Sequence, residues 1–148
     1  MGLDQYAYAV EVEKSATIRE VREVINSDAG SEQIGKWRKH PNLEGWMSDL
    51  WHARRQQETV LDGIVKGRLP GNMAPDYPRA FNCEYVELFS SDLDRLERLV
   101  IGGDLPKTGG FFWGSDSDDY YKESDREFIR AARKQIASGS RIFYSSWW

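Results

Sequence analysis

The run GFFWGSDSDDYY contains three aspartates, and carboxylates are ligands that calcium and magnesium ions prefer. Counted as an EF-hand loop, Asp116, Asp118 and Glu127 fall at the first, third and twelfth positions. The sixth position, where the loop needs glycine for its sharp turn, is Tyr121. We therefore expect no metal site here and interpret the aspartates as the start of a helix, whose N-terminus favours negative charge. A metal-assisted hydrolase using Asp116 and Asp118 stays open as an alternative.

The chain has two histidines, His40 and His52, and one cysteine, Cys83. These are the residue types of a zinc site or of a thiol nucleophile with its base, but their spacing is typical of neither. Cys83 alternates with Phe81 and Tyr85, which indicates a strand residue that points into the core. We expect a buried structural thiol, no catalytic residue and no cofactor.

The most basic segment of the chain is KWRKH, in which Trp37 lies among Arg38, Lys39 and His40. A stacking ring among cations suits a single-stranded nucleic acid or an acidic protein surface. The alternative is an ordinary strand with Trp37 directed inward and its charges outward. We carry the four residues forward as candidates for partner binding, because an exposed tryptophan is a frequent interface anchor.

Three more tryptophans are candidates for contact with a partner. Trp147 and Trp148 end the chain, where termini usually fray, so their apolar surface needs something to cover it. They either complete the core as an edge strand or contact another subunit, which would make the protein a homo-oligomer. Trp113 ends a short aromatic strand and points either into the core or toward a partner.

Periodicity predicts the elements that must position these residues. Alternating apolar residues indicate strands, and apolar residues three and four apart indicate helices with capping and turn residues at their ends. Residues 58–80 contain Gly and Pro without either period, and we expect an irregular insertion or loop there. The predicted strands are 5–13, 34–39, 81–89, 111–113 and 141–148, and the predicted helices are 18–25, 41–57, 92–100 and 118–137.

The predicted fold is a single α+β domain over residues 1–148. Strands that alternate apolar with polar residues indicate a sheet with one open face, whereas the strands of a parallel sheet are apolar throughout. We therefore expect a mixed or mainly antiparallel sheet of about five strands with about four helices packed on it.

Composition narrows the classes of function. The net charge of −4 argues against a protein dominated by nucleic-acid binding, which needs an excess of Lys and Arg. One cysteine cannot form an internal disulfide, which favours a reducing cytoplasm. We expect no signal peptide, because the start MGLDQYAYAV lacks a basic segment followed by an apolar one, and no membrane span.

The chain resembles a group of small uncharacterised proteins carried by bacteriophages and prophages. The similarity lies in the opening GLDQYAYAV, in the WRK segment before a helix, and in GFFWGS followed by Asp and Tyr. These match the GLDxYxY start and the GFFFGS-type strand of that group, with GFFW in place of GFFF. The resemblance implies a phage context and a small α+β domain, and it implies no catalytic residue.

These observations favour a phage-encoded, non-enzymatic binding protein that acts in the infected cytoplasm on a host or defence protein. Its contact surface would be aromatic, with the 58–80 segment as a further candidate. Two alternatives stay open: a small metal-assisted hydrolase of a nucleotide or phosphoester, and a nucleic-acid accessory protein that uses residues 36–40.

Overall fold

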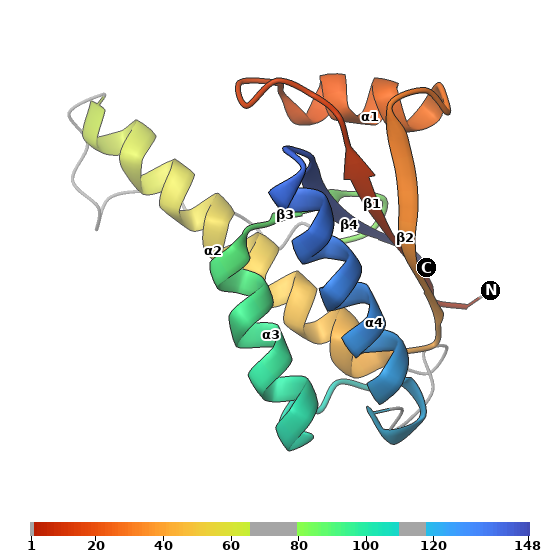
Figure 1. The fold of residues 1–148 in the computed structure, drawn as a ribbon. Helices are drawn as coiled ribbons and strands as arrows, with labels where there is room; N and C mark the ends of the chain where they lie inside the picture. The colour runs from red at the N-terminus through yellow and green to blue at the C-terminus, as the bar shows by residue number, and fades with distance from the viewer. Residues whose placement is uncertain (1, 66–79, 110–117) are drawn as a thin grey trace.

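The computed structural model describes residues 2–65, 80–109 and 118–148 (Figure 1). The predicted strand at 111–113 and most of the 58–80 segment lie outside the described residues. In chain order the elements are β1 (Asp4–Val10), α1 (Ile18–Asn26), β2 (Ser31–Arg38), α2 (Pro41–Val65), β3 (Tyr85–Leu88), α3 (Ser90–Gly102), α4 (Asp118–Ala137) and β4 (Arg141–Trp147).

The described strands form one antiparallel sheet in the order β2-β1-β4-β3, which confirms the α+β fold. In the register of the sheet, Gln5 of β1 lies opposite Trp37 of β2 and Ser146 of β4. One residue further on, Tyr6 lies opposite Lys36 and Ser145. Successive side chains point to opposite faces of a sheet, so these two rows belong to different faces.

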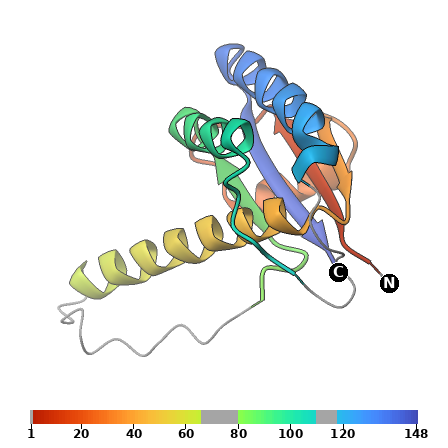
Figure 2. The same cartoon turned by 90° about the horizontal axis from the view of Figure 1, so that it is seen from below.

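The inner face of the sheet, which carries Gln5, Trp37 and Tyr144, packs against three helices. Helices α3 and α4 lie side by side in both views (Figures 1 and 2), and the first half of α2 joins them in the core. The main core residues are Ala7, Trp37, Val86, Ile142 and Tyr144 from the sheet, with Leu43, Met47, Trp51, Leu93, Leu96, Phe128 and Ile129 from the helices. A second, smaller core lies on the outer face, where Val21 and Ile25 of α1 cover Val10 and Phe143.

Local sequence explains where the helices begin and end. Thr17 forms a capping box with Glu20 at the start of α1, because each accepts the other's backbone N–H. At the start of α3, the Asp92 carboxylate accepts the backbone N–H of Phe89 at 2.8 Å, so the two serines that follow Phe89 are not the cap. Helix α3 ends at Gly102, and its C-cap is Gly103. The φ of Gly103 is 66°, a left-handed conformation that glycine adopts more easily than other residues.

The sheet has four strands among the described residues, close to the expected number of about five, and the expected strand 111–113 lies outside these residues. Two expectations about the elements need correction. The C-terminal strand β4 lies between β1 and β3 and is therefore a central strand, not an edge strand. Helix α2 continues to Val65, so residues 58–65, expected to be irregular, are helical. The second half of this helix extends away from the rest of the domain (Figures 1 and 2).

A buried carboxylate, Asp125 of α4, binds two side chains at the end of β2. It accepts the indole N–H of Trp37 at 2.9 Å, and its other oxygen lies 2.9 Å from Nε2 of His40. The Trp37 ring packs on Phe128 at 5.1 Å and against Gly35, where a Cβ would lie only 2.4 Å from the indole. Glycine at position 35 is thus required for the indole to lie flat along its own strand.

A second buried carboxylate, Glu44 of α2, lies at the other end of the same polar network. It accepts hydrogen bonds from the hydroxyls of Tyr144 at 2.6 Å and Ser146 at 2.7 Å. The amide of Gln5 links the two ends, because it donates to Tyr144 and to the carbonyl of His40 and accepts the backbone N–H of His40. Every one of these groups is buried, so the network satisfies polar atoms that would otherwise be costly in the core.

We predict that Asp125→Ala lowers the free energy of unfolding by about 2–5 kcal/mol, because it leaves the buried indole N–H of Trp37 without its acceptor and removes the carboxylate from Nε2 of His40. The control is Glu127→Ala, an exposed carboxylate two residues away on α4, which should change stability by less than about 0.5 kcal/mol. Urea denaturation of both variants measures the difference. Equal stability of the two variants would show that the network contributes nothing.

A second prediction concerns pH. Burial raises the pKa of Glu44, against the opposing effect of its hydroxyl donors. The folded chain therefore holds this proton more tightly than the unfolded chain, and the free energy of unfolding rises as the pH falls through the folded-state pKa. We expect Glu44→Gln to weaken this gain in stability between about pH 7 and about pH 5.

Urea denaturation across this pH range, with Glu127→Gln as the exposed control, gives the slopes. The slope of Glu44→Gln should be smaller than that of the wild type, with some slope remaining because burial also raises the pKa of Asp125. Parallel curves for the wild type and Glu44→Gln would contradict the assignment of the proton to Glu44.

Candidate partner-binding surface

The outer face of the sheet is only partly covered. Helix α1 packs over the end of the sheet that holds Val10 and Phe143, and the partly exposed Tyr8 and Tyr85 pack against this cluster. Tyr6 and Trp147 lie beyond it. Tyr6 and Tyr8 point outward from the central strand β1, and Tyr85 points outward from β3. We call this region the tyrosine face, and define it by Tyr6, Tyr8, Tyr85, Trp147 and Lys36.

The rings of the tyrosine face are ordered by contacts with one another and with cations. Tyr6 and Tyr8 are stacked, with ring centroids 6.4 Å apart and an angle of 25° between the planes. Lys36 lies over the Tyr6 ring at 6.0 Å, and the guanidinium of Arg22 lies over the Tyr85 ring at 5.2 Å. These contacts fix the ring faces before any partner arrives, which lowers the entropy lost on binding.

A hollow of about 200 Å³ lies at the centre of this face. Its lining combines aromatic rings with polar groups, which come from α1, β4 and the turn before β3. The lining residues are Tyr6, Tyr8, Arg22, Asn26, Cys83, Tyr85, Ser145, Ser146 and Trp147. The volume is below the roughly 300–1,000 Å³ of a pocket for a whole small molecule, so the hollow suits a single side chain of a larger partner.

Trp147 lines the hollow, Trp148 follows it in the chain, and the two are held differently. Trp147 pairs with Asp4 across the sheet, and 62% of its surface is exposed. Trp148 is tied to the turn before β3, where its indole donates to the carbonyl of Phe81 and its backbone N–H donates to Asn82, each at 3.0 Å. The chain end is therefore fixed, and Trp147 remains as a large exposed ring on an ordered strand.

The charges around the tyrosine face are mostly paired. Arg22 lies 3.7 Å from Glu84, and Arg38 lies 3.8 Å from Asp4. Among the described residues Lys36 has no carboxylate partner, and its contact is with the Tyr6 ring. Burial raises the pKa of the Tyr8 and Tyr85 hydroxyls, so both remain neutral donors at physiological pH. Asp28 adds a negative charge near Tyr8, so the cations and carboxylates around this face are about balanced and Lys36 is the cation without a carboxylate partner among the described residues.

The candidates in the segment 36–40 are divided between the two faces. Trp37 and His40 are buried and bonded to Asp125, so neither is accessible to a partner. Arg38 and Lys39 are exposed, beside the tyrosine face. The remaining candidate from sequence, Trp113, lies outside the described residues.

The groups considered for metal or thiol chemistry do not converge. Asp118 lies in the first turn of α4, where its Oδ1 accepts from Asn42 at 2.9 Å and its Oδ2 lies 3.6 Å from Nζ of Lys107. Asp116 lies outside the described residues. The His40 ring is bonded to Asp125 inside the domain, whereas Cys83 lines the outer hollow. In the described part of the chain, no group of three or more His, Cys, Asp or Glu could hold a metal ion.

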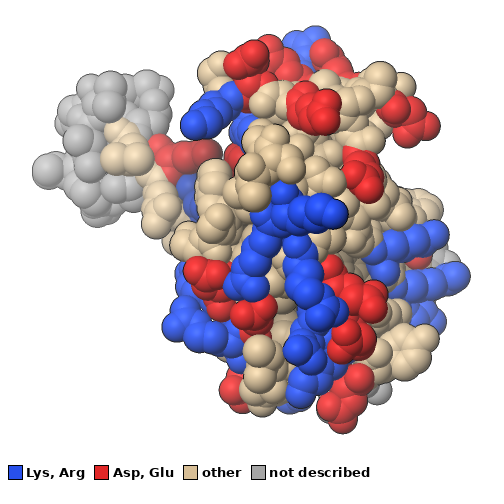
Figure 3. All heavy atoms as spheres, in the orientation of Figure 1, with Lys and Arg blue, Asp and Glu red and all other residues tan. Residues whose placement is uncertain are grey.

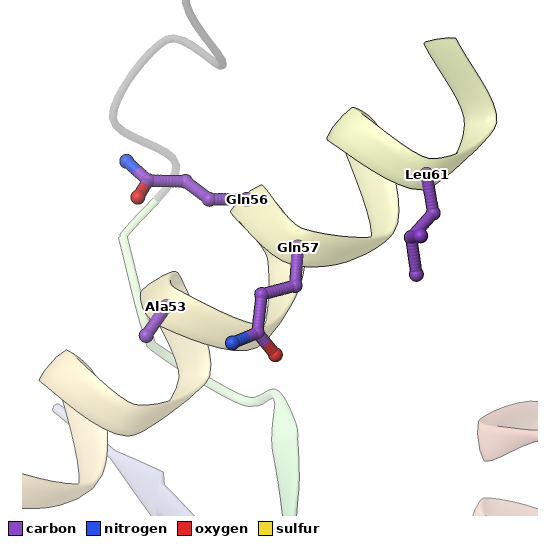
Figure 4. Close-up of a pocket in the computed structure, with 4 residues that line it drawn as sticks. All are labelled: Ala53, Gln56, Gln57 and Leu61. Carbon is purple, nitrogen blue, oxygen red and sulfur yellow. The ribbon is translucent and has the colours of Figure 1, made fainter. Parts of the chain in front are cut away.

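Two other hollows are less suited to a ligand. A cleft of about 500 Å³ between α1, α2 and β3 contains Arg54 and Arg141, but these bind Asp92 and Glu87. A shallow hollow of about 610 Å³ lies along the extended half of α2, where Ala53, Gln56, Gln57 and Leu61 line it (Figure 4). All four of these described residues come from a single helix, so they line one side of the hollow.

The opposite side of the domain, over α3 and α4, is strongly charged but mixed. Lys and Arg form a band down this side, with Asp and Glu on both flanks (Figure 3). Arg133 binds both Asp94 and Glu97, and Arg130 binds Glu123 at 2.9 Å. Cations that are already paired offer little to a phosphate backbone, so this side is a poor nucleic-acid surface.

The chain matches no protein-family model, no curated protein and no solved structure. Among the described helices, none combines the length and the apolar character that crossing a membrane requires. The tyrosine face is therefore defined by the geometry of its residues in this structure.

Tyr6 and Tyr8 are two residues apart in the first predicted strand, so the period of two places them on one face, but it does not indicate that this face is exposed. The prediction of Cys83 as a buried thiol is wrong: the strand begins at Tyr85, and Cys83 is exposed in a turn with φ of 59°. Three tyrosines on two strands are brought together by the strand order, which the sequence pattern does not contain.

We predict that the thiol of Cys83 reacts in the folded protein, because it is exposed and lines the hollow. The chain has no other cysteine, so one equivalent of a coloured disulfide reagent should react without denaturant. Cys83→Ser, which removes the thiol, is the blank. A thiol that reacts only after unfolding would contradict the exposed position of Cys83.

Proposed function

We propose that this chain is a non-enzymatic binding protein that recognises another protein through its tyrosine face. The observation that carries the proposal is the hollow of about 200 Å³, whose lining is mainly Tyr, Trp, Ser, Asn and Arg. These residue types dominate antibody binding sites, because Tyr and Trp give large contact area at low entropic cost and Ser and Asn supply adaptable hydrogen bonds. Tyr, Trp and Arg are also the usual hot spots of interfaces.

The setting of this function is proposed from the sequence resemblance. In a phage-encoded protein of this kind, the partner would be a host or defence protein met in the cytoplasm of the infected cell. The single cysteine supports a reducing compartment. A fixed, partly exposed aromatic surface without a converging catalytic group among the described residues suits capture of a partner more than turnover of a substrate.

A second candidate function is binding of single-stranded nucleic acid. Stacked Tyr6 and Tyr8 beside Lys36 and Arg38 have the elements of a stacking platform with a basic border. The net charge of −4 and the pairing of Arg38 with Asp4 weigh against it. The two candidates differ in salt dependence, since phosphate contacts weaken steeply as salt rises.

The native thiol provides the test. A photoreactive maleimide on Cys83 places the cross-linker at the hollow, and irradiation in host lysate should join the chain to one protein. With that protein purified, we expect Tyr6→Ala or Trp147→Ala to weaken binding about 30-fold, the effect of an interface hot spot. Calorimetry or fluorescence anisotropy measures the loss.

The matched control is Tyr120→Ala, because Tyr120 is 82% exposed on α4 and lies outside the tyrosine face. It should bind the partner like the wild type. Circular dichroism shows that each variant is folded. Partner affinity that is unchanged in Tyr6→Ala and Trp147→Ala, or a lysate that yields only cross-linked nucleic acid, would refute the proposal.

A further inference from the structure

We infer that the hollow receives one aromatic side chain from an acidic segment of the partner, with a carboxylate of that segment on Lys36. This inference rests on the proposed function and specifies the chemistry that the tyrosine face selects. It follows from the size of the hollow, its lining and the charges around it.

The size and lining of the hollow indicate a planar side chain that combines an aromatic ring with a polar edge, because rings and polar groups line it together. The volume of about 200 Å³ is too small for a whole ligand and large enough for a side chain. The lining includes the rings of Tyr6, Tyr8, Tyr85 and Trp147, and aromatic rings pack favourably edge to face or offset against one another. An aromatic side chain therefore gains more here than an aliphatic one of similar size.

The charges exclude a cationic side chain from the hollow. Rings on several sides of a small hollow can bind an ammonium group, but Arg22 lines this one and already lies over the Tyr85 ring at 5.2 Å. A second cation would meet the like charge of Arg22 and, next to it, that of Lys36. The inserted side chain is therefore neutral, and Arg22 offers it a guanidinium edge.

Lys36 is the reason for inferring that the partner's segment is acidic. Of the cations on this face, Arg22 and Arg38 are paired with Glu84 and Asp4, while the described residues provide no carboxylate for Lys36. A carboxylate of the partner would form an ion pair with Lys36, and complementary charge also steers the approach of the partner.

The register of the sheet fixes the distance between the two contacts. Lys36 lies directly opposite Tyr6 on the neighbouring strand, and the hollow extends from Tyr6 across β4 toward Tyr85. Neighbouring strands are about 4.8 Å apart, so the carboxylate and the aromatic ring are separated by roughly one to two strand spacings, about 5–10 Å. An extended segment covers that distance in about two or three residues.

The test uses labelled peptides of defined composition. The probe is an eight-residue peptide with a central Trp flanked on both sides by Asp and Glu; one comparison peptide replaces Trp by Ala, and another replaces the acids by Lys. By fluorescence anisotropy we expect the probe to bind about tenfold or more tightly than the Ala peptide. It should bind about fivefold more tightly than the Lys peptide.

Lys36→Glu is the decisive variant, because Lys36 is exposed and its substitution leaves the core intact. It should reverse the preference, so that the Lys peptide binds more tightly than the acidic one. Tyr120→Ala should leave peptide binding unchanged.

Several results would overturn the inference. They are equal affinity for the acidic and Lys peptides, no reversal in Lys36→Glu, or an oligothymidine that binds more tightly than the acidic probe and displaces it. The chain itself contains an exposed aromatic beside an acid, Tyr120 next to Asp119. Self-association of the wild type that Tyr120→Ala removes would make a second copy the occupant and would also overturn it.

The proposed function has its own outcome. If Tyr6→Ala and Trp147→Ala lose the cross-linked partner while no acidic aromatic peptide binds, the tyrosine face remains the binding site and only the chemistry inferred for its occupant fails.

Discussion

The buried carboxylate of Asp125 determines which side of β2 faces the core. It accepts the indole of Trp37 and contacts His40, and these bonds are possible only when Trp37 points toward α4. Since neighbouring residues of a strand point in opposite directions, Lys36 must then point outward. The register places Tyr6 opposite Lys36, so the same constraint directs the tyrosines of β1 to the outer face. A single interaction in the core thus sets the composition of the surface on the far side of the sheet.

The tyrosine face exists because one short helix must cover the outer face alone. Helix α1 has nine residues and spans about 13 Å, whereas the seven residues of β1 span about 23 Å. The two buried residues of α1, Val21 and Ile25, cover Val10 and Phe143 and leave the other end of the sheet open. The inner face has three helices and no comparable gap among the described residues. The aromatic side chains of the outer face cover only part of the sheet surface that α1 leaves open.

The periodicity of apolar residues predicts most of the helices and strands, but it does not predict how they are arranged in space. The pattern from Asp118 to Ala137 is that of one amphipathic helix, and the structure confirms it with the same ends. The period of two in KWRKH indicates two faces but does not say which one is buried; Asp125, which decides it, is distant in sequence. The central position of β4 likewise depends on tertiary pairing with β1 and β3. Cys83 was predicted to lie in a strand because the alternation of apolar residues begins at Phe81. The strand β3 itself begins at Tyr85, and Cys83 lies in the turn before it.

The edge of the sheet next to the tyrosine face favours contact through side chains over contact through the backbone. Strand β2 is an edge strand, and an edge with free N–H and C=O groups can pair with another strand. Two features oppose this: the register shift opposite Ala7 and Tyr8, which distorts the edge, and the exposed charges of Lys36 and Arg38 along it. The cations along this edge therefore lie beside the rings of the tyrosine face, and this side of the sheet presents side chains rather than a regular row of free peptide groups.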